Sequence, residues 1–324
     1  MIPTAGRPEY LPRAVASALA GMAAGDVEVL VVPNGPDASW QSSLAPWAGN
    51  AHVRIYPLTT PNQNIARNHG IAHARGKFMR FLDDDDYLLP EAAAAQYSCI
   101  DSSNADVCSG PALVEDEDQT MSSALALPDT PDFLLSALSP RRLQLPFAHV
   151  YRRSSLENVQ WPPEILRSED IAFLIRYAVA APRVWCKVDP PVGVWFQHRA
   201  PRMSLAQPDS GVHETTASEL LAAYESLVAQ RRMTEICART VAEALWECVH
   251  RGFYLRPRYW SSIAAKAMNI DPEARPETST VGGFRFEGLN PLWLHWAAIP
   301  SRLSRHVYRT CRARLRGWDY RRTL

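Results

Sequence analysis

Short apolar runs alternate with helically patterned segments over the first third of the chain. Three runs predict buried strands, at residues 27–32, 52–56 and 77–82. Apolar residues recur at helical spacing in the segments 8–19, 64–74 and 90–100. The first strand is followed by Pro33-Asn34-Gly35-Pro36, a strong turn signal. Alternating strands and helices predict an α/β fold with a mostly parallel sheet that has helices on both faces.

The remainder of the chain divides into an irregular stretch and a helical stretch. Acidic and Pro-rich loops from about residue 109 give way to a predicted helix at 168–180 and strands near 184–188 and 192–196. From His213 onward the pattern is helical, with amphipathic segments at 219–228 and 236–249 and a polar linker at 271–283. We therefore expect one domain over residues 1–205 and a helical C-terminal region over residues 206–324.

Composition narrows the classes of function. The 324 residues carry a formal net charge of +0, so no global attraction to nucleic acid is expected. The six cysteines form no C-x-x-C pair, so their spacing indicates neither a zinc site nor a disulfide framework, and it favours the reduced cytoplasm. No apolar run approaches the ~20 residues of a membrane span. We expect a cytoplasmic protein that is soluble or peripheral to a membrane.

The most informative feature is a run of four aspartates, Asp83 to Asp86, directly after the strand predicted at 77–82. Adjacent carboxylates repel one another, and burying them is costly unless a cation neutralises them. If the strand continues, Asp83 and Asp85 point to one side. Carboxylates at the carboxyl end of a parallel strand suit Mg²⁺ or Mn²⁺ and the phosphates of a nucleotide. The alternative is a solvated acidic turn.

Four segments, in this order, resemble the motifs of family 2 glycosyltransferases, which have the GT-A fold. They are Pro3-Thr4-Ala5-Gly6-Arg7-Pro8, then Asn64-Ile65-Ala66-Arg67-Asn68-His69-Gly70-Ile71, then Phe81-Leu82-Asp83-Asp84-Asp85-Asp86, and finally Ser168-Glu169-Asp170-Ile171-Ala172-Phe173. The third resembles the D-x-D metal motif and the fourth the E-D motif of the catalytic base. The resemblance covers roughly residues 1–205. It implies a metal-dependent, inverting transfer of a sugar from a nucleotide-diphosphate donor to an acceptor hydroxyl.

The resemblance also implies roles for single residues. Thr4, Arg7 and Arg67 would lie beside the donor, and Asp83 and Asp84 would contribute to its binding. Asp83 and Asp85 would hold Mn²⁺ or Mg²⁺. Asp170 would be the catalytic base, with Glu169 structural or orienting, since adjacent helical side chains point apart. Without the resemblance, Ser168-Glu169-Asp170 would be an ordinary capped helix start.

Two departures from the family pattern affect the donor site. The family usually has an aspartate after the second strand that recognises the nucleobase. This chain has Asn34 instead, which could still hydrogen-bond a base, so Asn34 is a candidate donor-binding residue and the identity of the base is left open. The family's first strand usually has four or five apolar residues before the Pro-Thr pair, whereas here Met1 and Ile2 precede Pro3. We therefore expect the native start to lie upstream of Met1.

Other candidates surround this predicted site. The loop 197–204 resembles the family's loop that closes over the diphosphate, so His198 is a candidate metal ligand, and Arg199 and Arg202 are candidates for pairing with phosphate. The segment 146–153 would form part of the acceptor side. Trp161 is a candidate platform for stacking a sugar, although a core position is the usual place for a tryptophan.

The C-terminal tail is basic and amphipathic. Residues 301–324 contain eight arginines against one aspartate. On a helical projection, an apolar face is formed by Trp296, Ile299, Leu303, Val307, Cys311 and Trp318, with most of the arginines opposite. Such a helix is typical of binding to an anionic membrane surface, here through about residues 291–324, and it would suit a glycan or lipid-linked acceptor in surface polysaccharide assembly. The alternative is a helix that docks its apolar face on the protein.

Two other functions remain open. A sugar nucleotidyltransferase would share the α/β core and the metal carboxylates, but its G-x-G-T-R loop is missing after the first strand. A scaffold protein that binds nucleotide sugars without turning them over would explain the missing base-reading aspartate. Release of nucleoside diphosphate from a donor distinguishes an enzyme from a scaffold.

Overall fold

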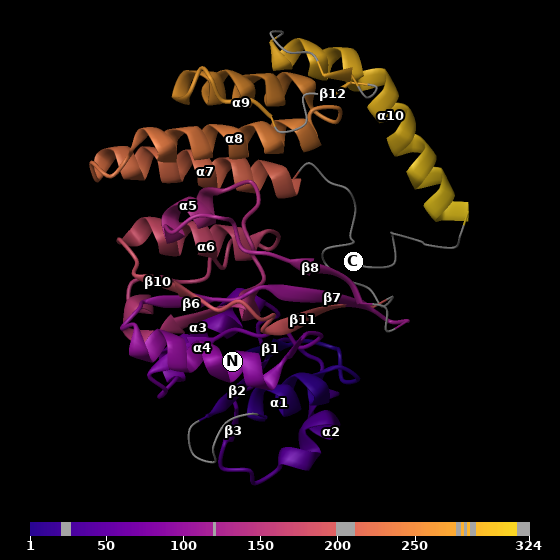
Figure 1. The fold of residues 1–324 in the computed structure, drawn as a ribbon. Coiled ribbons are helices and arrows are strands. Elements are labelled where there is room, and N and C mark those ends of the chain that lie inside the picture. Colours follow the sequence, from indigo (N-terminus) through magenta and orange to yellow (C-terminus); the bar gives the residue numbers. More distant parts are fainter. Residues whose placement is uncertain are drawn as a thin grey trace. The chain divides into compact units, whose positions relative to one another are not determined.

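The computed structural model describes residues 1–20, 27–118, 121–198, 211–276, 280–281, 284–285 and 290–315 (Figure 1). The chain forms two compact units. The first comprises Met1–Ala137 and Arg141–Arg199, and the second comprises Leu138–Pro140 and Ala200–Leu324. The boundary predicted near residue 205 falls within 199–210, outside the described residues, and stays a prediction.

The first unit is built on a continuous run of strands. Three of them, β1 (Ile2–Thr4), β2 (Val29–Pro33) and β3 (Val53–Ile55), pair in parallel in the order β1-β2-β3. The other edge of β1 lies beside the end of β4 (Phe78–Arg80), because the Leu82 N–H donates to the Met1 carbonyl at 3.0 Å. Beyond β4 the order is β9 (His149–Arg152), β6 (Val107–Ser109) and β10 (Trp185–Lys187), with antiparallel pairs on both sides of β9 and a parallel β6–β10 pair.

A second sheet has the order β5-β11-β7-β8. Its strands are β5 (Tyr87–Leu88), β11 (Gly193–Gln197), β7 (Ala112–Asp116) and β8 (Met121–Leu125). Strand β11 runs parallel to β7 and antiparallel to β5, and β8 is antiparallel to β7. Because β5 follows the aspartate run directly and β11 ends just before His198, this sheet brings two distant segments of the chain to one place.

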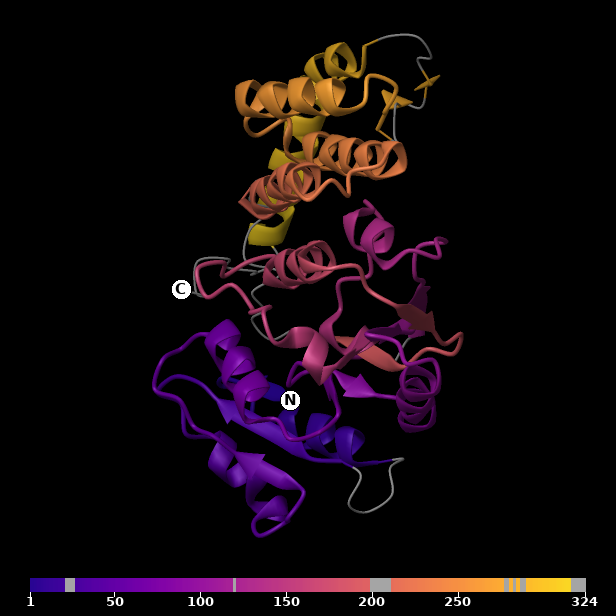
Figure 2. The same cartoon turned by 90° about the vertical axis from the view of Figure 1, so that its left-hand side faces the viewer.

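Helices cover both faces of the first sheet, as predicted. They include α1 (Leu11–Leu19), α3 (Gln63–His73) and α4 (Pro90–Ser102). Ile2 packs in one hydrophobic cluster with Leu11 and Val15 of α1. The neighbouring Met1 faces α3, where a Cβ on Gly70 would lie 2.4 Å from the Met1 Cγ, so glycine permits this close approach. Successive residues of a strand face opposite sides of the sheet, which places α1 and α3 on opposite faces (Figure 2).

The remaining helical segments of the first unit are short except for α6. They are α2 (Trp40–Leu44), η1 (Ala45–Trp47), α5 (Phe133–Leu138), η2 (Pro146–Ala148), η3 (Arg153–Leu156) and α6 (Glu169–Ala180). Helix α3 begins after Asn62, whose side-chain oxygen accepts hydrogen bonds from the backbone N–H groups of Asn64 and Ile65. This cap fixes the first turn of the helix that carries Arg67.

Two expectations about local structure are corrected. The third strand ends at Arg80, where its pairing with Val150 of β9 ends, so the aspartates do not continue it. They form a turn in which the Asp86 N–H donates to the Asp83 carbonyl at 3.2 Å. Residues 146–151 of the segment expected on the acceptor side are buried in the core, where β9 is paired along both edges, whereas Arg153 of that segment is exposed.

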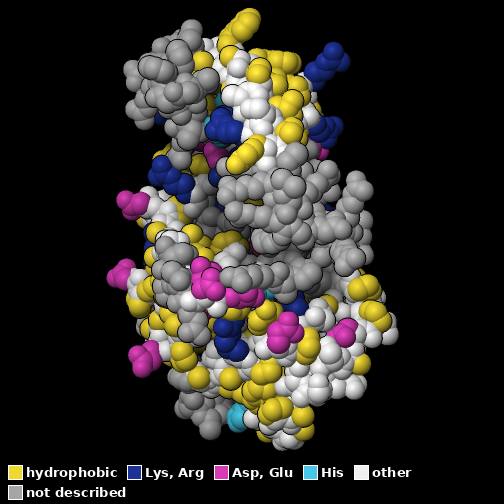
Figure 3. Space-filling view, turned by 90° about the vertical axis from the view of Figure 1, so that its right-hand side faces the viewer, with side chains coloured by type: hydrophobic (Ala, Val, Ile, Leu, Met, Phe, Trp, Pro, Cys, Tyr) yellow, Lys and Arg dark blue, Asp and Glu magenta, His cyan; other side chains and the backbone are white. Residues whose placement is uncertain are grey.

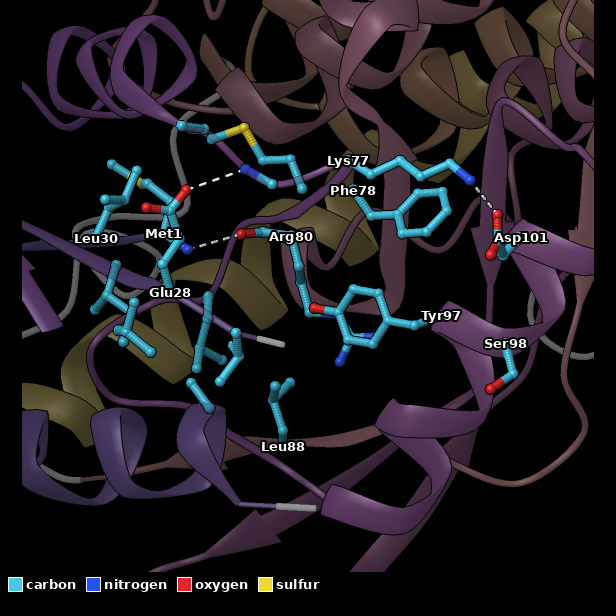
Figure 4. Close-up of a pocket in the computed structure, with 18 of the residues that line it drawn as sticks. Met1, Glu28, Leu30, Lys77, Phe78, Arg80, Leu88, Tyr97, Ser98 and Asp101 are labelled. Carbon is cyan, nitrogen blue, oxygen red and sulfur yellow. Dashed lines mark hydrogen bonds and ion pairs between the residues drawn. The ribbon is translucent and has the colours of Figure 1, made fainter. Parts of the chain in front are cut away.

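A cavity of about 740 Å³ lies at the amino end of β1, between β2, β4 and α4 (Figure 4). The Met1 amino group donates to the Arg80 carbonyl at 2.9 Å there, and burial lowers the pKa of that group to about 5. Lys77 and Asp101 form an ion pair among the lining residues. Since no residue of the aspartate run lines this cavity, it is separate from the site predicted from the sequence.

The second unit is mainly helical. Its described elements are α7 (Gly211–Ala229), α8 (Glu235–Gly252), α9 (Pro257–Ile270), the short strands β12 (Thr280–Val281) and β13 (Phe284–Arg285), and α10 (Pro291–Leu315). Val241, Leu245 and Trp246 of α8 are fully buried. Trp260 of α9 packs against Gly252, where a Cβ would lie 2.3 Å from its ring. Within the described part of the chain, no helix is long and apolar enough to cross a membrane.

Candidate functional site

The two even-numbered aspartates anchor the turn at Asp83–Asp86 to the sheets. The Thr4 hydroxyl at the end of β1 donates to Asp84 Oδ2 at 2.7 Å, and the Phe196 N–H of β11 donates to Asp86 Oδ1 at 3.0 Å. Both carboxylates are 2% exposed. Burial raises the pKa of Asp84 to about 7, against the opposing effects of Arg7 and the Thr4 hydrogen bond. These two residues therefore hold the turn in place.

Asp85 lies where three segments meet. Its Oδ2 accepts a hydrogen bond from Arg7 Nη1 and lies 3.0 Å from His198 Nε2, just after β11. The His198 ring is buried and stacks on Tyr10 with 4.6 Å between ring centroids. Arg7 Nη1 also lies 3.4 Å from Asp84 Oδ1. The predicted neighbours Arg7, Asp85 and His198 are thus brought together.

Arg67 is the centre of a second group of charges. Its side chain is 1% exposed, and Nη2 donates to Asp83 Oδ1 at 2.7 Å. Nη1 lies 3.6 Å from a carboxylate oxygen of Glu169 and 3.6 Å from Asp170 Oδ1. Burial alone would lower the pKa of Arg67, but the three carboxylates raise it above its ordinary value. The guanidinium therefore stays charged and joins the aspartate turn to the start of α6.

The two acidic residues at the start of α6 converge instead of pointing apart. We expected divergence from the geometry of a helix interior, but Glu169 and Asp170 occupy the first turn, and both approach Arg67. The preceding Ser168 has φ of 60° and makes no side-chain cap hydrogen bond, so the cap expected from its side chain is not formed. Helix α6, which carries both carboxylates, therefore starts after a residue whose backbone is in the left-handed region.

Asp170 and Glu169 differ in their exposure. The Asp170 side chain keeps 26% of its surface exposed, although Oδ1 is buried against Arg67, whereas the Glu169 side chain is 8% exposed. Glu169 also accepts a hydrogen bond from the Gln63 amide of α3. Burial raises the pKa of both carboxyl groups; for Asp170 the charge of Glu169 raises it further. Asp170 is the one of the two that a ligand can reach.

Asn34 lies directly beside Thr4. Both its backbone N–H and its side-chain Nδ2 donate to the Thr4 carbonyl, at 2.9 and 3.0 Å, and the residue is 6% exposed. Its amide nitrogen is thus engaged in joining β2 to β1. A contact with a nucleobase would use its side-chain oxygen or the second hydrogen on Nδ2.

Trp161 is a core residue, which corrects the expectation of a sugar-stacking platform. It is 1% exposed and stacks on Phe173 of α6, with ring centroids 4.1 Å apart and planes 2° apart. The Arg67 guanidinium lies 4.2 Å above the Trp161 ring. An apolar ring beneath a buried cation adds a cation–π attraction, so Trp161 supports Arg67 from below.

The predicted three-ligand set of Asp83, Asp85 and His198 is not gathered at one point. Within the described residues, Cys99, Cys108 and Cys186 form the one group of three or more candidate ligands close enough to share an ion. Asp83 is engaged by Arg67, whereas Asp85 and His198 remain adjacent at 3.0 Å. The two groups are hydrogen-bonded to each other in this metal-free chain, and they offer a carboxylate oxygen and an imidazole nitrogen, ligand types that suit Mn²⁺.

Arg13 and Asn64 contribute to the site but were not predicted as site residues from the sequence. Arg13 Nη2 donates to the Asp85 carbonyl at 3.0 Å, and the Asn64 side chain joins Arg67 to the carbonyls of Pro162 and Ile165. Asn64 lies three positions before Arg67 on α3, a helical spacing that could have indicated it, whereas Arg7 precedes α1 and no such spacing relates it to Arg13. Arg199 and Arg202 lie outside the described residues.

Comparison with known proteins agrees with this geometry. Residues 1–159 match the family described as glycosyl transferase family 2. The protein with the name "Putative glycosyltransferase EpsH" from Bacillus subtilis (strain 168) is 28% identical over 139 residues; the match spans 41% of this chain and 40% of EpsH.

Solved structures show the same fold. TarS 1–349 of S. aureus, in complex with UDP-GlcNAc, has a TM-score of 0.62 at 20% identity, covering 84% of this chain and 80% of that one. The mannosyltransferase PcManGT from Pyrobaculum calidifontis, in complex with GDP-Man and Mn²⁺, has a TM-score of 0.51 at 14% identity, covering 95% and 81%. Residues 1–159 thus match glycosyl transferase family 2, and the chain has the GT-A fold of these solved glycosyltransferase structures.

Proposed function

We propose that this glycosyltransferase moves a sugar from a nucleotide-diphosphate donor to an acceptor hydroxyl, with inversion at the anomeric carbon and with Mn²⁺ or Mg²⁺ as cofactor. The observation that carries the proposal is the carboxylate turn Asp83–Asp86, with Arg7 and His198 on one side and Arg67 and Asp170 on the other. The similar structures of TarS and PcManGT hold UDP-GlcNAc and GDP-Man, which supports a nucleotide-sugar donor.

Asp85 and His198 would hold the divalent ion. Mg²⁺ and Mn²⁺ sites often use one or two protein ligands and complete their shell with water and substrate phosphates. When bound, the ion would offset the negative charge that develops on the leaving diphosphate. His198 Nε2 lies 3.0 Å from Asp85 Oδ2, so an ion bound by both would replace the proton that these two atoms share.

The donor would lie along the carboxyl ends of β1, β2 and β4, as ligands do in open α/β sheets. Asp83 is 29% exposed and is oriented by Arg67, so we place it against a polar group of the donor such as the ribose. Arg7 is 28% exposed beside Asp84 and Asp85, where its guanidinium can also pair with a phosphate oxygen. Asn34 and Thr4 lie beneath the donor at the β1–β2 edge.

Asp170 would act as the general base. It accepts the proton of the acceptor hydroxyl as that oxygen attacks the anomeric carbon, and the bond to the diphosphate oxygen breaks with its electron pair. Burial and the neighbouring Glu169 raise the pKa of Asp170, which strengthens it as a base, while Arg67 stabilises its ionised form. Glu169, buried and bonded to Gln63, would orient Arg67 and not react itself.

The test compares Asp170→Asn with the wild-type chain, using donors with different bases and sugars in the presence of Mn²⁺. We expect the variant to lose about 10²–10⁴-fold in nucleoside diphosphate release, the usual contribution of a general base. The calorimetric Kd for the nucleoside diphosphate should stay within about twofold, since Asp170 does not contact it. Asp189→Asn, an exposed carboxylate of the same unit, serves as the matched control.

Retained turnover in Asp170→Asn would refute its role as base. A wild-type chain that binds a nucleotide sugar with Mn²⁺ but releases no nucleoside diphosphate, with any acceptor offered, would instead favour the scaffold function. The two outcomes are separated because binding and turnover are measured on the same samples.

For the acceptor, we propose a glycan or lipid-linked molecule reached at the inner face of the cytoplasmic membrane, in surface polysaccharide assembly. Support comes from α10, whose Leu294, His295 and Ala298 are buried while its other side is exposed. The exposed apolar side chains are Trp293 at 73%, Trp296 at 44%, Leu303 at 45% and Val307 at 52%. Hydrophobic side chains lie beside Lys and Arg side chains in the upper part of Figure 3, as in helices that bind anionic membranes.

Sedimentation with anionic liposomes tests this membrane contact. The double variant Leu303→Glu/Val307→Glu should lower the bound fraction at least several-fold, because both side chains are exposed and would enter the interface. The buried face of α10 is untouched, so folding should be kept. Equal sedimentation of variant and wild type would exclude this face of α10 as the membrane contact.

A further inference from the structure

Three cysteine thiols from separate elements of the first unit meet beneath one edge of the sheet. Cys99 comes from α4, Cys108 from β6 and Cys186 from β10. Their Sγ atoms all lie within 4.8 Å of one another. Cys108 and Cys186 are register partners in the parallel β6–β10 pair, and α4 packs over both strands. The fold therefore gathers thiols that are far apart along the chain.

The spacing of the thiols is close to that of a metal site. Zn–S bonds of about 2.3 Å in tetrahedral geometry place two sulfurs about 3.8 Å apart. The three sulfurs are at most 4.8 Å apart. Side-chain rotations that move the sulfurs by about 1 Å bring all three within bonding distance of one ion. Cys108 is fully buried, whereas Cys99 and Cys186 are partly exposed, so an ion can enter from solvent.

The donor set is chemically distinct from the carboxylate turn. All three ligand atoms are sulfur, and no fourth His, Cys, Asp or Glu joins the group among the described residues. Thiolates select soft ions such as Zn²⁺ and Cu⁺ over Mg²⁺ and Mn²⁺, which prefer oxygen. Ile100, Ala105 and Val150 pack around the cluster, and the Ser103 side chain is hydrogen-bonded to the Cys186 thiol.

We infer that Cys99, Cys108 and Cys186 form a three-thiolate site for a thiophilic metal ion of the Zn²⁺ class, with water in the fourth position. On binding, each coordinated thiol releases its proton to solvent and the sulfur lone pair forms the bond to the ion, so no redox change is involved. The ion joins α4 to β6 and β10 and so stabilises this edge of the unit. The cysteine spacing in the sequence contains no zinc motif, because the three ligands come together only in the fold.

The test uses the full-length chain, freed of metal by a chelator and kept reduced, and titrated with Zn²⁺ in the presence of a competing chelator. We expect one tightly bound ion per chain, and ultraviolet thiolate-to-metal charge-transfer absorption when Cd²⁺ replaces Zn²⁺. In the double variant Cys99→Ala/Cys186→Ala, the affinity should fall at least about 100-fold, because one thiol remains. These two residues are only partly buried, and circular dichroism is used to check that the variant is folded.

The matched control is Cys237→Ala/Cys248→Ala, which removes two buried thiols of the second unit and should keep the wild-type affinity. The proposal is overturned if wild type binds no stoichiometric Zn²⁺, if the Cys99/Cys186 variant keeps the affinity, or if the control loses it. Glycosyl transfer with Mn²⁺ is recorded for all variants, and unchanged transfer by the Cys99/Cys186 variant shows that this site is independent of the proposed transfer reaction.

Discussion

The carboxylate turn Asp83–Asp86 and the thiol cluster of Cys99, Cys108 and Cys186 each gather one kind of ligand atom, but their surroundings are opposite. The carboxylates are surrounded by positive charge, with Arg7 against Asp84 and Asp85 and Arg67 against Asp83. The thiols lie among apolar side chains. An aspartate of ordinary pKa is ionised at neutral pH and must be paired when buried, whereas a thiol of ordinary pKa is protonated and neutral.

The two clusters should therefore respond differently to the loss of one side chain. In the carboxylate turn every charge depends on another, so removing one partner leaves an uncompensated charge in a poorly solvated place. In the thiol cluster, removing one sulfur leaves only a small void. Four substitutions test this contrast, and they are ordered below by the size of the effect we expect.

The largest effect is expected from Arg67→Gln. It leaves Asp83, Glu169 and Asp170 without their shared cation, and breaking such a buried network costs about 3–5 kcal/mol. Urea unfolding with matched m-values measures the loss. Lys77→Gln, which breaks an exposed pair with Asp101, is the control and should cost far less. Equal losses in the two variants would show that Arg67 is not the centre of a cooperative network.

Asp85→Ala should act mainly on turnover. If Asp85 and His198 hold the ion, the variant loses about 10²–10³-fold in kcat and its Mn²⁺ requirement shifts to higher concentration. Steady-state assays over a Mn²⁺ titration measure both quantities. Turnover that saturates at the same Mn²⁺ concentration as wild type would place the ion elsewhere and weaken the contrast between the two clusters.

Asp84→Asn should change the pH dependence of stability in the metal-free chain. Burial raises the folded-state pKa of Asp84 from its ordinary value of 3.8 to about 7, so between these values the folded state holds a proton that the unfolded state has lost. This group therefore favours folding at low pH and loses that contribution as the pH rises through 7. The contribution of Asp84 to the free energy of unfolding changes by at most about 1.4 kcal/mol per pH unit.

Asp84→Asn should remove the contribution of Asp84 to the pH dependence of the free energy of unfolding. Unfolding free energies measured with a chelator at several values between pH 4 and 8 should therefore fall less steeply for Asp84→Asn than for wild type. Parallel curves for the two chains would show that Asp84 is ionised in the folded state throughout, as its neighbour Arg7 would favour.

The smallest effect is expected from Cys108→Ala. Replacing a fully buried thiol by a methyl group leaves a small void and no unpaired charge, so the metal-free chain should lose about 1 kcal/mol. The same urea assay as for Arg67→Gln gives the value. A loss as large as that of Arg67→Gln would mean that the thiols, like the carboxylates, depend on one another without metal.

The sequence pattern predicted the elements whose signals are local. The apolar run at 27–32 became β2, and the periodic segments at 64–74 and 90–100 became α3 and α4, with ends shifted by one to two residues. Strand β9 was missed because its residues match no alternating pattern; it is buried on both faces and defined by its neighbours. Strands β7 and β8 were not predicted, because the acidic residues at 115–118 interrupt the apolar pattern and indicate a loop.

For the site, the order of motifs indicated which residues to examine but not how they pair. Three of the predicted residues contact the aspartate turn directly, namely Thr4, Arg7 and Arg67. The fourth, Asp170, lies beside Arg67. That Arg67 would bind three carboxylates, and that Trp161 would lie under it, depends on the packing of α3 against α6. No spacing along the chain contains that information, just as none revealed the meeting of the three thiols.

The hydrogen bonds that hold Asp84 and Asp86 have a consequence for the entropy of ligand binding. Thr4 and Phe196 immobilise these two residues when the chain folds, and the backbone between them carries Asp85. The conformational freedom that a flexible acidic loop would lose on binding an ion has already been lost here. Metal binding should therefore show little unfavourable conformational entropy, as expected of a preorganised ligand.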